Sequence, residues 1–504
     1  MFGGLSPFYK RVIQYILAFV ALVVLCRLTK DLFALVVVLY GIFQALSHKP
    51  GRALVLFLAL PFAGAISPLL FPRTSIFMIA ARGGMVAMTL AMLLVTSERR
   101  GRNVLPLGML SFYIAVEAIS SMNGYAPMVS YLKLLSFSCF IVGMIVGTRN
   151  LHERPQDLME LRVAFFAFAC ITIFGSILVL PFPSIAYYTS LAGTIRAVGE
   201  SEALIRYQQS QMSGGMNLFT GVYFHSQALA PMLGCLTGWV FCDMVVVERR
   251  LARVHLAMLA VLPVLMYLTR SRLALLMLGV AVLMACGYCF PHMKLDRYLR
   301  GKIKSFLMLG SILLMLGAVA FEVKSQALTK WVRKTNDVAA DTRSATEAFT
   351  ETRMGAIDNG LYDFRKNPML GMGFQVAWHT PEAIRSGWAT WYSAPIEKSL
   401  LPMIVLGEGG IVGSIAFLIF LCSFFAQCHA KHYHITITLF VLLLTSNLAE
   451  GTFFSPNGIG GPLWLVTVVG GFVLDTIVVY RRNIERLARQ QQLEMAAFGQ
   501  YAPR

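Results

Sequence analysis

Long apolar runs, separated by polar connections, recur along almost the whole chain. Runs of about 20 apolar residues are long enough to cross a bilayer core of ~30 Å as α-helices. The pattern therefore predicts an all-α fold, a polytopic transmembrane helical bundle of about 12 to 14 spans, in which two short early runs either cross or are re-entrant or interfacial. The predicted spans are Val12–Cys26, Asp31–Leu46, Ala53–Phe71, Ser75–Thr96, Val104–Ser121, Met128–Gly147, Arg162–Leu180, Val222–Val246, Val254–Thr269, Arg272–Phe290, Ile303–Phe321, Leu400–Phe425, Ile435–Ala449 and Gly461–Tyr480.

Two polar connections, Pro181–Gly221 and Glu322–Ser399, are too long to be simple turns. Loops beyond about 12–15 residues are usually functional or disordered. The second is rich in tryptophan, which favours the membrane interface, so we expect it to carry short helices on the membrane face. The predicted organisation is N-terminal transmembrane helices (1–180), a first periplasmic loop (181–221), central transmembrane helices (222–321), a large periplasmic loop (322–399), C-terminal transmembrane helices (400–480) and a cytoplasmic amphipathic tail (481–504).

Composition agrees with a membrane protein. The chain is 57% hydrophobic and only 13% charged, and its mean hydropathy is +0.67. Soluble domains carry about 25% charged residues, so most of this surface faces something other than water. The nine cysteines lie in or beside apolar runs, and none lies in Glu322–Ser399. We therefore expect no exterior domain held by disulfides.

The net charge of +18 suggests a nucleic-acid ligand, but the distribution of that charge argues against one. Lys and Arg cluster in alternate connections between spans, as the positive-inside rule expects. Examples are Arg52, Arg249 and Arg297 on the side assigned to the cytoplasm. We expect a multi-pass inner-membrane protein with both termini in the cytoplasm, a lipid bilayer around it and no nucleic-acid partner.

Two arginines, Arg270 and Arg272, lie at an exterior junction between two apolar spans. Charged side chains are costly near a membrane and often mark function, and the planar guanidinium binds phosphate oxygens through paired hydrogen bonds. The alternative is that both side chains snorkel to the interface; their pairing at a helix turn favours phosphate binding. Further exterior candidates for the same role are Arg196, Arg206 and Arg353.

The large exterior loop ends in two further motifs. Asn-Pro followed by Gly371 and Gly373 predicts a turn with close backbone approach, for which a structural role is the commoner one. Glu397 and Lys398 lie where the chain re-enters the membrane, and Glu408 lies within the apolar helix that follows. An intramembrane carboxylate needs a partner such as an arginine. Structural and functional roles are equally open for Glu408, whereas Glu397 favours function.

His225 begins another span from its exterior side. A lone histidine there is more often a hydrogen-bonded packing residue than a ligand or a base. No group of Asp, Glu and His residues has the spacing of metal ligands, so we expect a reaction without a metal or another cofactor.

In order and spacing, these motifs resemble the O-antigen ligase and O-antigen polymerase family of bacterial envelope biogenesis. The resemblance covers about the C-terminal two-thirds, from Pro181 onward. Its ligases usually carry a histidine just before the re-entry helix, where this chain has Ser393–Lys398, which favours a polymerase over a ligase. The matching segments are the polar span start at Gly221–Ala230, the Thr-x-Ser-Arg turn at Thr269–Arg272, the Asn-Pro element at Asn367–Gly373 and the glycine-rich helix at Glu408–Gly413.

The resemblance implies glycosyl transfer from a polyprenyl-pyrophosphate-linked saccharide to a sugar acceptor at the periplasmic face, without a nucleotide sugar. Its expected partners include other polysaccharide export proteins. Arg272 and Arg270 would then hold the pyrophosphate, helped by Arg206, Arg353, Arg196 or Lys398. Glu397 is the first candidate for the general base and His225 the second. Two alternatives stay open: a ligase that uses a lipid A-core acceptor, and a transporter or flippase of the same lipid-linked substrate.

Overall fold

The described part of the chain is helical. The computed structural model describes residues 6–67, 75–96, 106–149, 151–187, 219–223, 226–249, 251–269, 271–292, 301, 305, 345–376, 380–385, 400–448, 451–456 and 458–500. These residues form no β-strand, only two isolated bridges, Ile66 with Tyr223 and Tyr187 with Phe219. The helices are α1 (Pro7–Leu28), α2 (Leu32–Leu46), α3 (Pro50–Ala65), α4 (Ser75–Thr96), α5 (Leu107–Met122), α6 (Pro127–Thr148), η1 (Leu151–Glu153), α7 (Pro155–Leu178), α8 (Pro183–Ala186), α11 (Ser226–Cys242), η2 (Asp243–Glu248), α12 (Arg253–Leu268), α13 (Arg272–Leu283), η3 (Met284–Cys289), α14 (Phe290–His292), α17 (Ala345–Lys366), α18 (Thr380–Arg385), α19 (Leu401–Ala430), α20 (His434–Ser446), α21 (Gly460–Trp464), η4 (Leu465–Val469) and α22 (Gly470–Gln500).

The helices have the length and surface of a membrane bundle. Within the described residues, seven helices are long and apolar enough to cross a bilayer, and six further apolar helices are shorter. Large apolar side chains face outward, with Leu94 77% and Leu283 70% exposed. An apolar outer surface is stable in lipid and unfavourable in water. The prediction of a helical membrane protein is therefore confirmed, while the number of crossings stays a prediction and the predicted span Ile303–Phe321 lies mostly outside the described residues.

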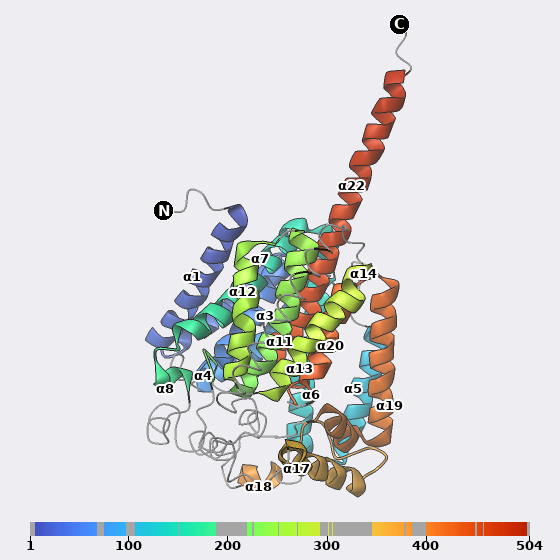
Figure 1. Cartoon of the computed structure of the whole chain (residues 1–504). Coiled ribbons are helices and arrows are strands. Elements are labelled where there is room, and N and C mark those ends of the chain that lie inside the picture. The colour runs from blue at the N-terminus through green and yellow to red at the C-terminus, as the bar shows by residue number, and fades with distance from the viewer. Residues whose placement is uncertain are drawn as a thin grey trace.

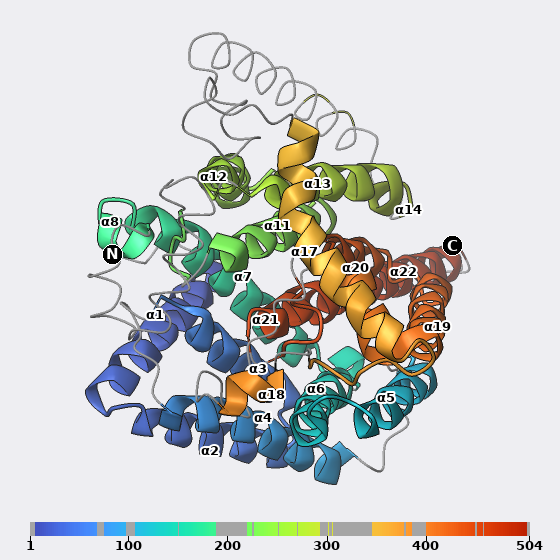
Figure 2. The same ribbon diagram turned by 90° about the horizontal axis from the view of Figure 1, so that it is seen from below.

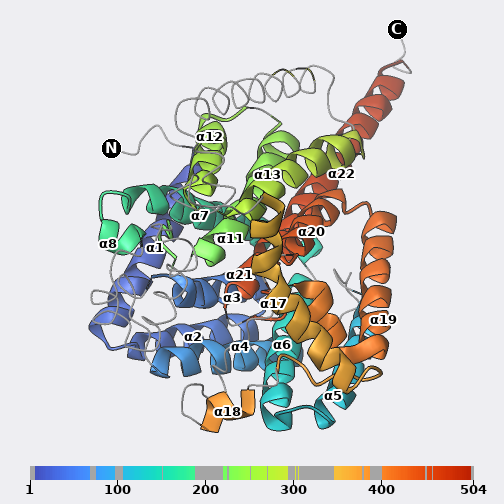
Figure 3. The same cartoon turned by 60° about the horizontal axis from the view of Figure 1, so that its bottom comes forward.

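The two termini lie at one end of the bundle, which we call the terminal end (Figure 1). Helices α17 and α18, from the segment predicted as the large loop, cover the opposite end, which we call the α17 end (Figure 1). Seen from that end, α17 crosses the bundle from the neighbourhood of α13 towards α19 (Figures 2 and 3). The described part of this segment, α17 and α18, therefore lies at the end away from both termini.

Helix α11 occupies the centre of the bundle, and its whole apolar stretch is buried. Glycines let its neighbours approach closely. A methyl group at Gly234 would lie 2.6 Å from Met277 of α13, and one at Gly238 would lie 2.4 Å from Leu442 of α20. Small residues bring helix backbones together in membranes, where packing rather than the hydrophobic effect drives association.

The last helix does not end at the predicted boundary between residues 480 and 481. Helix α22 runs without interruption to Gln500 and projects beyond the bundle (Figure 1). Its first turns outside the bundle are joined to η2 and the residue after it: Arg481 Nη1 donates to the Val247 carbonyl at 2.5 Å, and Arg249 forms an ion pair with Glu485 at 3.2 Å. The predicted tail is thus a continuation of the last span rather than a separate helix, and its place on the bilayer surface stays a prediction.

Candidate functional site

The Asn-Pro element and the glycine-rich helix, far apart in the predicted loop and span, are interlocked. Helix α19 is broken at Gly410, whose φ of 61° and ψ of −155° are not helical. A break there separates two backbone carbonyls from the two amides that would pair with them in an unbroken helix. The Asn-Pro element supplies the missing partners on both sides. The four hydrogen bonds are Met372 N to Gly407 O (2.9 Å), Gly373 N to Glu408 O (3.0 Å), Ile411 N to Pro368 O (2.9 Å) and Val412 N to Met369 O (3.1 Å).

This exchange requires glycine at two positions. Gly371 has a φ of 70°, and a Cβ there would lie 2.2 Å from the Glu408 carbonyl oxygen. A Cβ on Gly410 would lie 2.5 Å from the backbone of Met369. Both positions combine a backbone conformation that glycine tolerates best with contact against rigid main chain. The predicted close backbone approach at Gly371 is therefore present, and its partner is Glu408.

Serines from α5 and α6 hold the same loop from the other side. Ser120 Oγ accepts a hydrogen bond from Gly373 N at 3.2 Å and donates one to the Glu408 carbonyl. Ser121 Oγ accepts from Phe374 N at 3.3 Å, and Ser130 Oγ donates to Phe374 O at 2.9 Å. The sequence analysis missed these serines. The available signal was a pair of adjacent hydroxyl residues at the end of an apolar span.

Two carboxyl groups are buried beside the broken helix. Glu408 and Glu117 of α5 are both fully buried. A Cβ on Gly409 would lie 2.5 Å from Glu117 Oε1, and one on Gly413 would lie 3.1 Å from it, so α19 needs glycine to admit this side chain. The phenol of Tyr113 interacts with both carboxyl groups. The two acids thus share one region of the membrane-embedded bundle, next to the interlocked backbone.

A third buried carboxyl group lies where α17 meets α19. Asp363 is 1% exposed. A methyl group placed on Gly407 of α19 would lie 3.3 Å from the Cβ atom of Asp363. Tyr125 lies in the connection between α5 and α6, and its pKa is raised first by burial and then by the negative charge of Asp363. Asp363 therefore lies close to α19 and to the α5–α6 connection.

The Thr-x-Ser-Arg turn joins α12 to α13. Thr269 is buried. Its Oγ1 donates a hydrogen bond to Met266 O at 2.7 Å and accepts one from Ser271 N at 3.4 Å. Arg272 is the first residue of α13, and its Nε and Nη2 atoms are buried. Helix α13 runs from the α17 end towards the terminal end (Figure 1). The guanidinium is therefore turned into the protein at the α17 end, rather than extended to the solvent.

The other predicted site residues cannot be compared with the structure. Arg353 is a residue of α17, but only its backbone belongs to the described part of the structure. The remaining candidates lie outside the described residues altogether: His225, Arg196, Arg206, Arg270, Glu397 and Lys398. The structure therefore brings together Gly371, Gly373 and Glu408, and puts Arg272 at the same end as α17.

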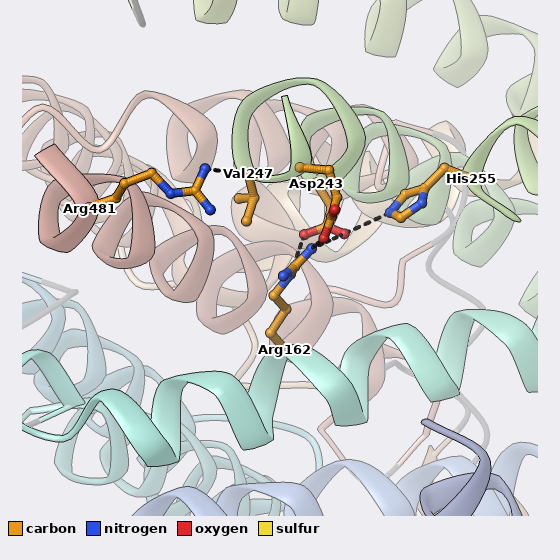
Figure 4. A network of polar contacts seen from close by, with 6 residues as sticks. Arg162, Asp243, Val247, His255 and Arg481 are labelled. Atoms are coloured by element: carbon orange, nitrogen blue, oxygen red, sulfur yellow. Dashed lines mark hydrogen bonds and ion pairs between the residues drawn. The ribbon is translucent and has the colours of Figure 1, made fainter. Parts of the chain in front are cut away.

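A second polar network joins α7, η2 and α12 (Figure 4). Phe8, at the start of α1, packs against Arg162, so this network lies at the terminal end. Arg162 of α7 donates to both oxygens of Asp243, at 2.7 and 3.1 Å, and to Glu248 at 2.5 Å. His255 Nε2 lies 2.8 Å from the second Asp243 oxygen. Arg162, Asp243 and His255 are all buried. The sequence carries a signal for this network, because Arg162 and Asp243 are charged residues within two apolar runs. Neither was predicted as a site residue.

The described residues contain no group of three or more His, Cys, Asp or Glu side chains that could hold a metal ion.

No protein-family model matches the chain, and no curated protein matches it significantly.

Proposed function

We propose that this protein transfers a saccharide from a polyprenyl-pyrophosphate carrier to a sugar acceptor at the outer face of the bacterial inner membrane, as a polymerase of O-antigen or exopolysaccharide repeats. The observation that carries the proposal is the meeting of Asn367–Gly373 with Glu408–Gly413 through four backbone hydrogen bonds. Both segments belong to the set of motifs that resembles the O-antigen ligase and polymerase family. Their contact supports the resemblance, since the backbone amides and carbonyls of each segment pair with those of the other.

The proposed chemistry follows from the leaving group. The acceptor hydroxyl oxygen attacks the anomeric carbon, the bond from that carbon to the pyrophosphate oxygen breaks, and the lipid pyrophosphate departs with additional negative charge. Fixed cations stabilise this charge most strongly where water is scarce. We assign that role to Arg272 and Arg270, with Arg206, Arg353, Arg196 and Lys398 as further cations. Glu397, or else His225, accepts the proton of the acceptor hydroxyl.

Glu408 has a supporting role in this proposal. Its carbonyl oxygen accepts from Gly373 and Ser120, and its carboxyl group is fully buried. The interlocked segments fix the end of α17 against α19, and thereby fix both ends of the segment between them, residues 374–407, which carries Glu397. A rigid frame is what a catalytic residue on a loop requires.

One observation favours the transporter alternative. Discontinuous helices with buried charges at membrane depth are typical of substrate and ion sites in transporters. Helix α19 is broken at Gly410, and Glu117 and Glu408 are buried beside the break. A flippase would change the sidedness of the lipid-linked saccharide without changing its length. The ligase alternative differs in its acceptor, a lipid A-core.

The test is an assay of purified protein in nanodiscs with a lipid-linked oligosaccharide, resolved by product length. We expect longer lipid-linked chains from the wild type. Removal of one stabilising group from a developing charge typically lowers kcat about 100- to 1,000-fold, and we expect such a loss in Arg272→Ala and a smaller one in Arg272→Lys. The matched control is Arg27→Ala, an exposed arginine at the end of α1.

Three results would contradict the proposal. Unchanged chain length with altered sidedness in proteoliposomes would indicate a flippase. Full activity of Arg272→Ala at normal protein levels would remove the pyrophosphate role of Arg272, and full activity of Glu397→Gln would remove Glu397 as the base. In cells, a deletion strain that keeps single repeats on the lipid supports a polymerase, whereas unattached long chains indicate a ligase.

A further inference from the structure

Helices α5 and α19 bring two glutamates of the apolar bundle together. The two helices lie side by side (Figures 2 and 3), and Glu117 of α5 and Glu408 of α19 are both fully buried. The Oε1 atom of Glu117 lies 2.5 Å from the position of a Cβ on Gly409 and 3.1 Å from that of a Cβ on Gly413. The Glu117 carboxyl group is therefore next to the residue that follows Glu408 in the chain.

A tyrosine hydroxyl lies near both acids. Tyr113 precedes Glu117 by one helical turn of α5 and is 1% exposed. Its hydroxyl oxygen is buried and has no hydrogen bond of ordinary geometry to the described residues, while the negative charges of Glu117 and Glu408 both act on it. A phenol hydroxyl can donate one hydrogen bond and accept another. It can therefore accept from a protonated carboxyl group on one side and donate to a carboxylate on the other.

Burial and mutual repulsion together oppose the ionisation of both glutamates. Removal from water disfavours the charged form of a carboxyl group, and a second carboxylate nearby disfavours it further. Two such groups therefore commonly share one proton, and the binding of that proton is a property of the pair rather than of either residue.

The surrounding charges suit a single proton. Lys133 of α6 is half-buried, and its Nζ donates to the Gln375 carbonyl at 2.9 Å. Asp363 of α17 is a third buried acid, with Tyr125 near it, and His434 of α20 lies beyond the far end of α19. The cation on α6 favours one carboxylate, and the acid on α17 disfavours a second. The described groups around the site therefore favour one carboxylate and one neutral acid.

We propose that Glu117, Tyr113 and Glu408 form a binding site for one exchangeable proton inside the membrane-embedded bundle. With the proton bound, one glutamate is a carboxylic acid that donates to the Tyr113 oxygen, and the phenol donates to the carboxylate of the other. Release of the proton leaves two carboxylates in a buried site, where they repel each other. The contact between α5 and α19 therefore weakens as the pH rises through the release of the proton. This site does not depend on the proposed glycosyl transfer.

The first experiment is carbodiimide modification of the full-length protein in nanodiscs, with the modified residue identified by mass spectrometry. Dicyclohexylcarbodiimide is apolar and reacts with protonated carboxyl groups. We expect it to modify Glu117 or Glu408 near neutral pH, and to react about tenfold more slowly for each pH unit above the release of the proton. Exposed Asp358 of α17 is the internal control. It should stay unmodified, because exposed carboxyl groups are ionised at neutral pH.

Infrared spectroscopy tests the same site without a reagent. A protonated carboxyl group absorbs apart from carboxylates, and we expect this band in the wild type and its loss in the double variant Glu117→Gln/Glu408→Gln. Glutamine has nearly the shape of glutamate and does not ionise, so the helices keep their packing. Tyr113→Phe should shift the band without removing it, since the acid loses a hydrogen-bond partner. Asp358→Asn should leave the band unchanged.

Two results would overturn the proposal. The first is a wild-type protein in which carbodiimide modifies neither Glu117 nor Glu408 at any pH. The second is a carboxyl band that is the same in the wild type and the double variant, which would place the proton elsewhere, for example on Asp363. Product length in the transferase assay is measured separately, so neither result depends on whether the protein transfers a saccharide.

Discussion

Arg162 shows how a single buried charge is accommodated in this bundle. Its guanidinium faces two carboxylates, Asp243 and Glu248, while Phe8 covers it with its ring 4.7 Å away. A buried charge without a partner is highly unfavourable, but a buried pair with good geometry can be neutral or better. Arg162 therefore matters mainly because its removal leaves two acids without their cation.

The first prediction concerns this residue. Arg162→Met should lower the free energy of unfolding by about 3–5 kcal/mol, because one partner of a buried ion pair is removed. Arg52→Met is the matched control. Arg52 also pairs with a glutamate, Glu160, at 3.1 Å, but its side chain is 40% exposed, so the expected loss is about 0–1 kcal/mol. Unfolding by SDS in mixed micelles measures both, and equal losses would contradict the prediction.

At the scale of elements, the break in α19 is completed by a segment from outside that helix. Residues 368–373 replace the hydrogen bonds that Gly410 removes, and serines of α5 and α6 hold the loop in place. A break with its backbone groups paired is tolerated inside a membrane, whereas unpaired groups are costly. Helices α5, α17 and α19 are thus joined at one point.

The second prediction tests this join. Gly371→Ala should destabilise the protein and abolish activity, because its Cβ would lie 2.2 Å from the Glu408 carbonyl, at a φ of 70°. Gly279→Ala is the matched control in α13, where a new Cβ meets nothing within 4 Å and alanine is favoured by about 1 kcal/mol in a helix. Thermal unfolding and monodispersity in detergent report the difference. A Gly371→Ala protein with wild-type stability would contradict the interlocked arrangement.

For the whole molecule, the position of both termini at one end and of α17 at the other fits an even number of crossings (Figure 1). The positive-inside rule predicts that the terminal end lies in the cytoplasm. With that orientation the Arg162 network would face the cytoplasm, and the Asn-Pro element would face the periplasm.

The third prediction is the sidedness itself. In a Cys422→Ser background, a membrane-impermeant maleimide should label Tyr362→Cys, in α17, in intact spheroplasts. It should label Leu487→Cys, in α22, only after permeabilisation. Both side chains are exposed, at 46% and 60%, so accessibility does not limit either reaction. The reverse pattern would invert the proposed orientation, and labelling of both in intact cells would contradict it.

The sequence by itself determined the apolar helices, because the length and hydrophobicity of a span are local properties. It predicted Ser75–Thr96 with both bounds correct and most other described spans to within six residues at each end. The exceptions are Arg162–Leu180, where the helix begins earlier, at Pro155, and Gly461–Tyr480, where the helix continues to Gln500. It also predicted that Gly371 allows a close backbone approach. These features need no knowledge of what lies next to each segment.

Only the tertiary structure decided which segments meet. Arg162 and Asp243 are separated by 81 residues, Ser120 and Glu408 by 288, and nothing local to either partner specifies the other. Buried polar groups must find partners because water is absent, but the fold of the whole chain decides which partners are within reach.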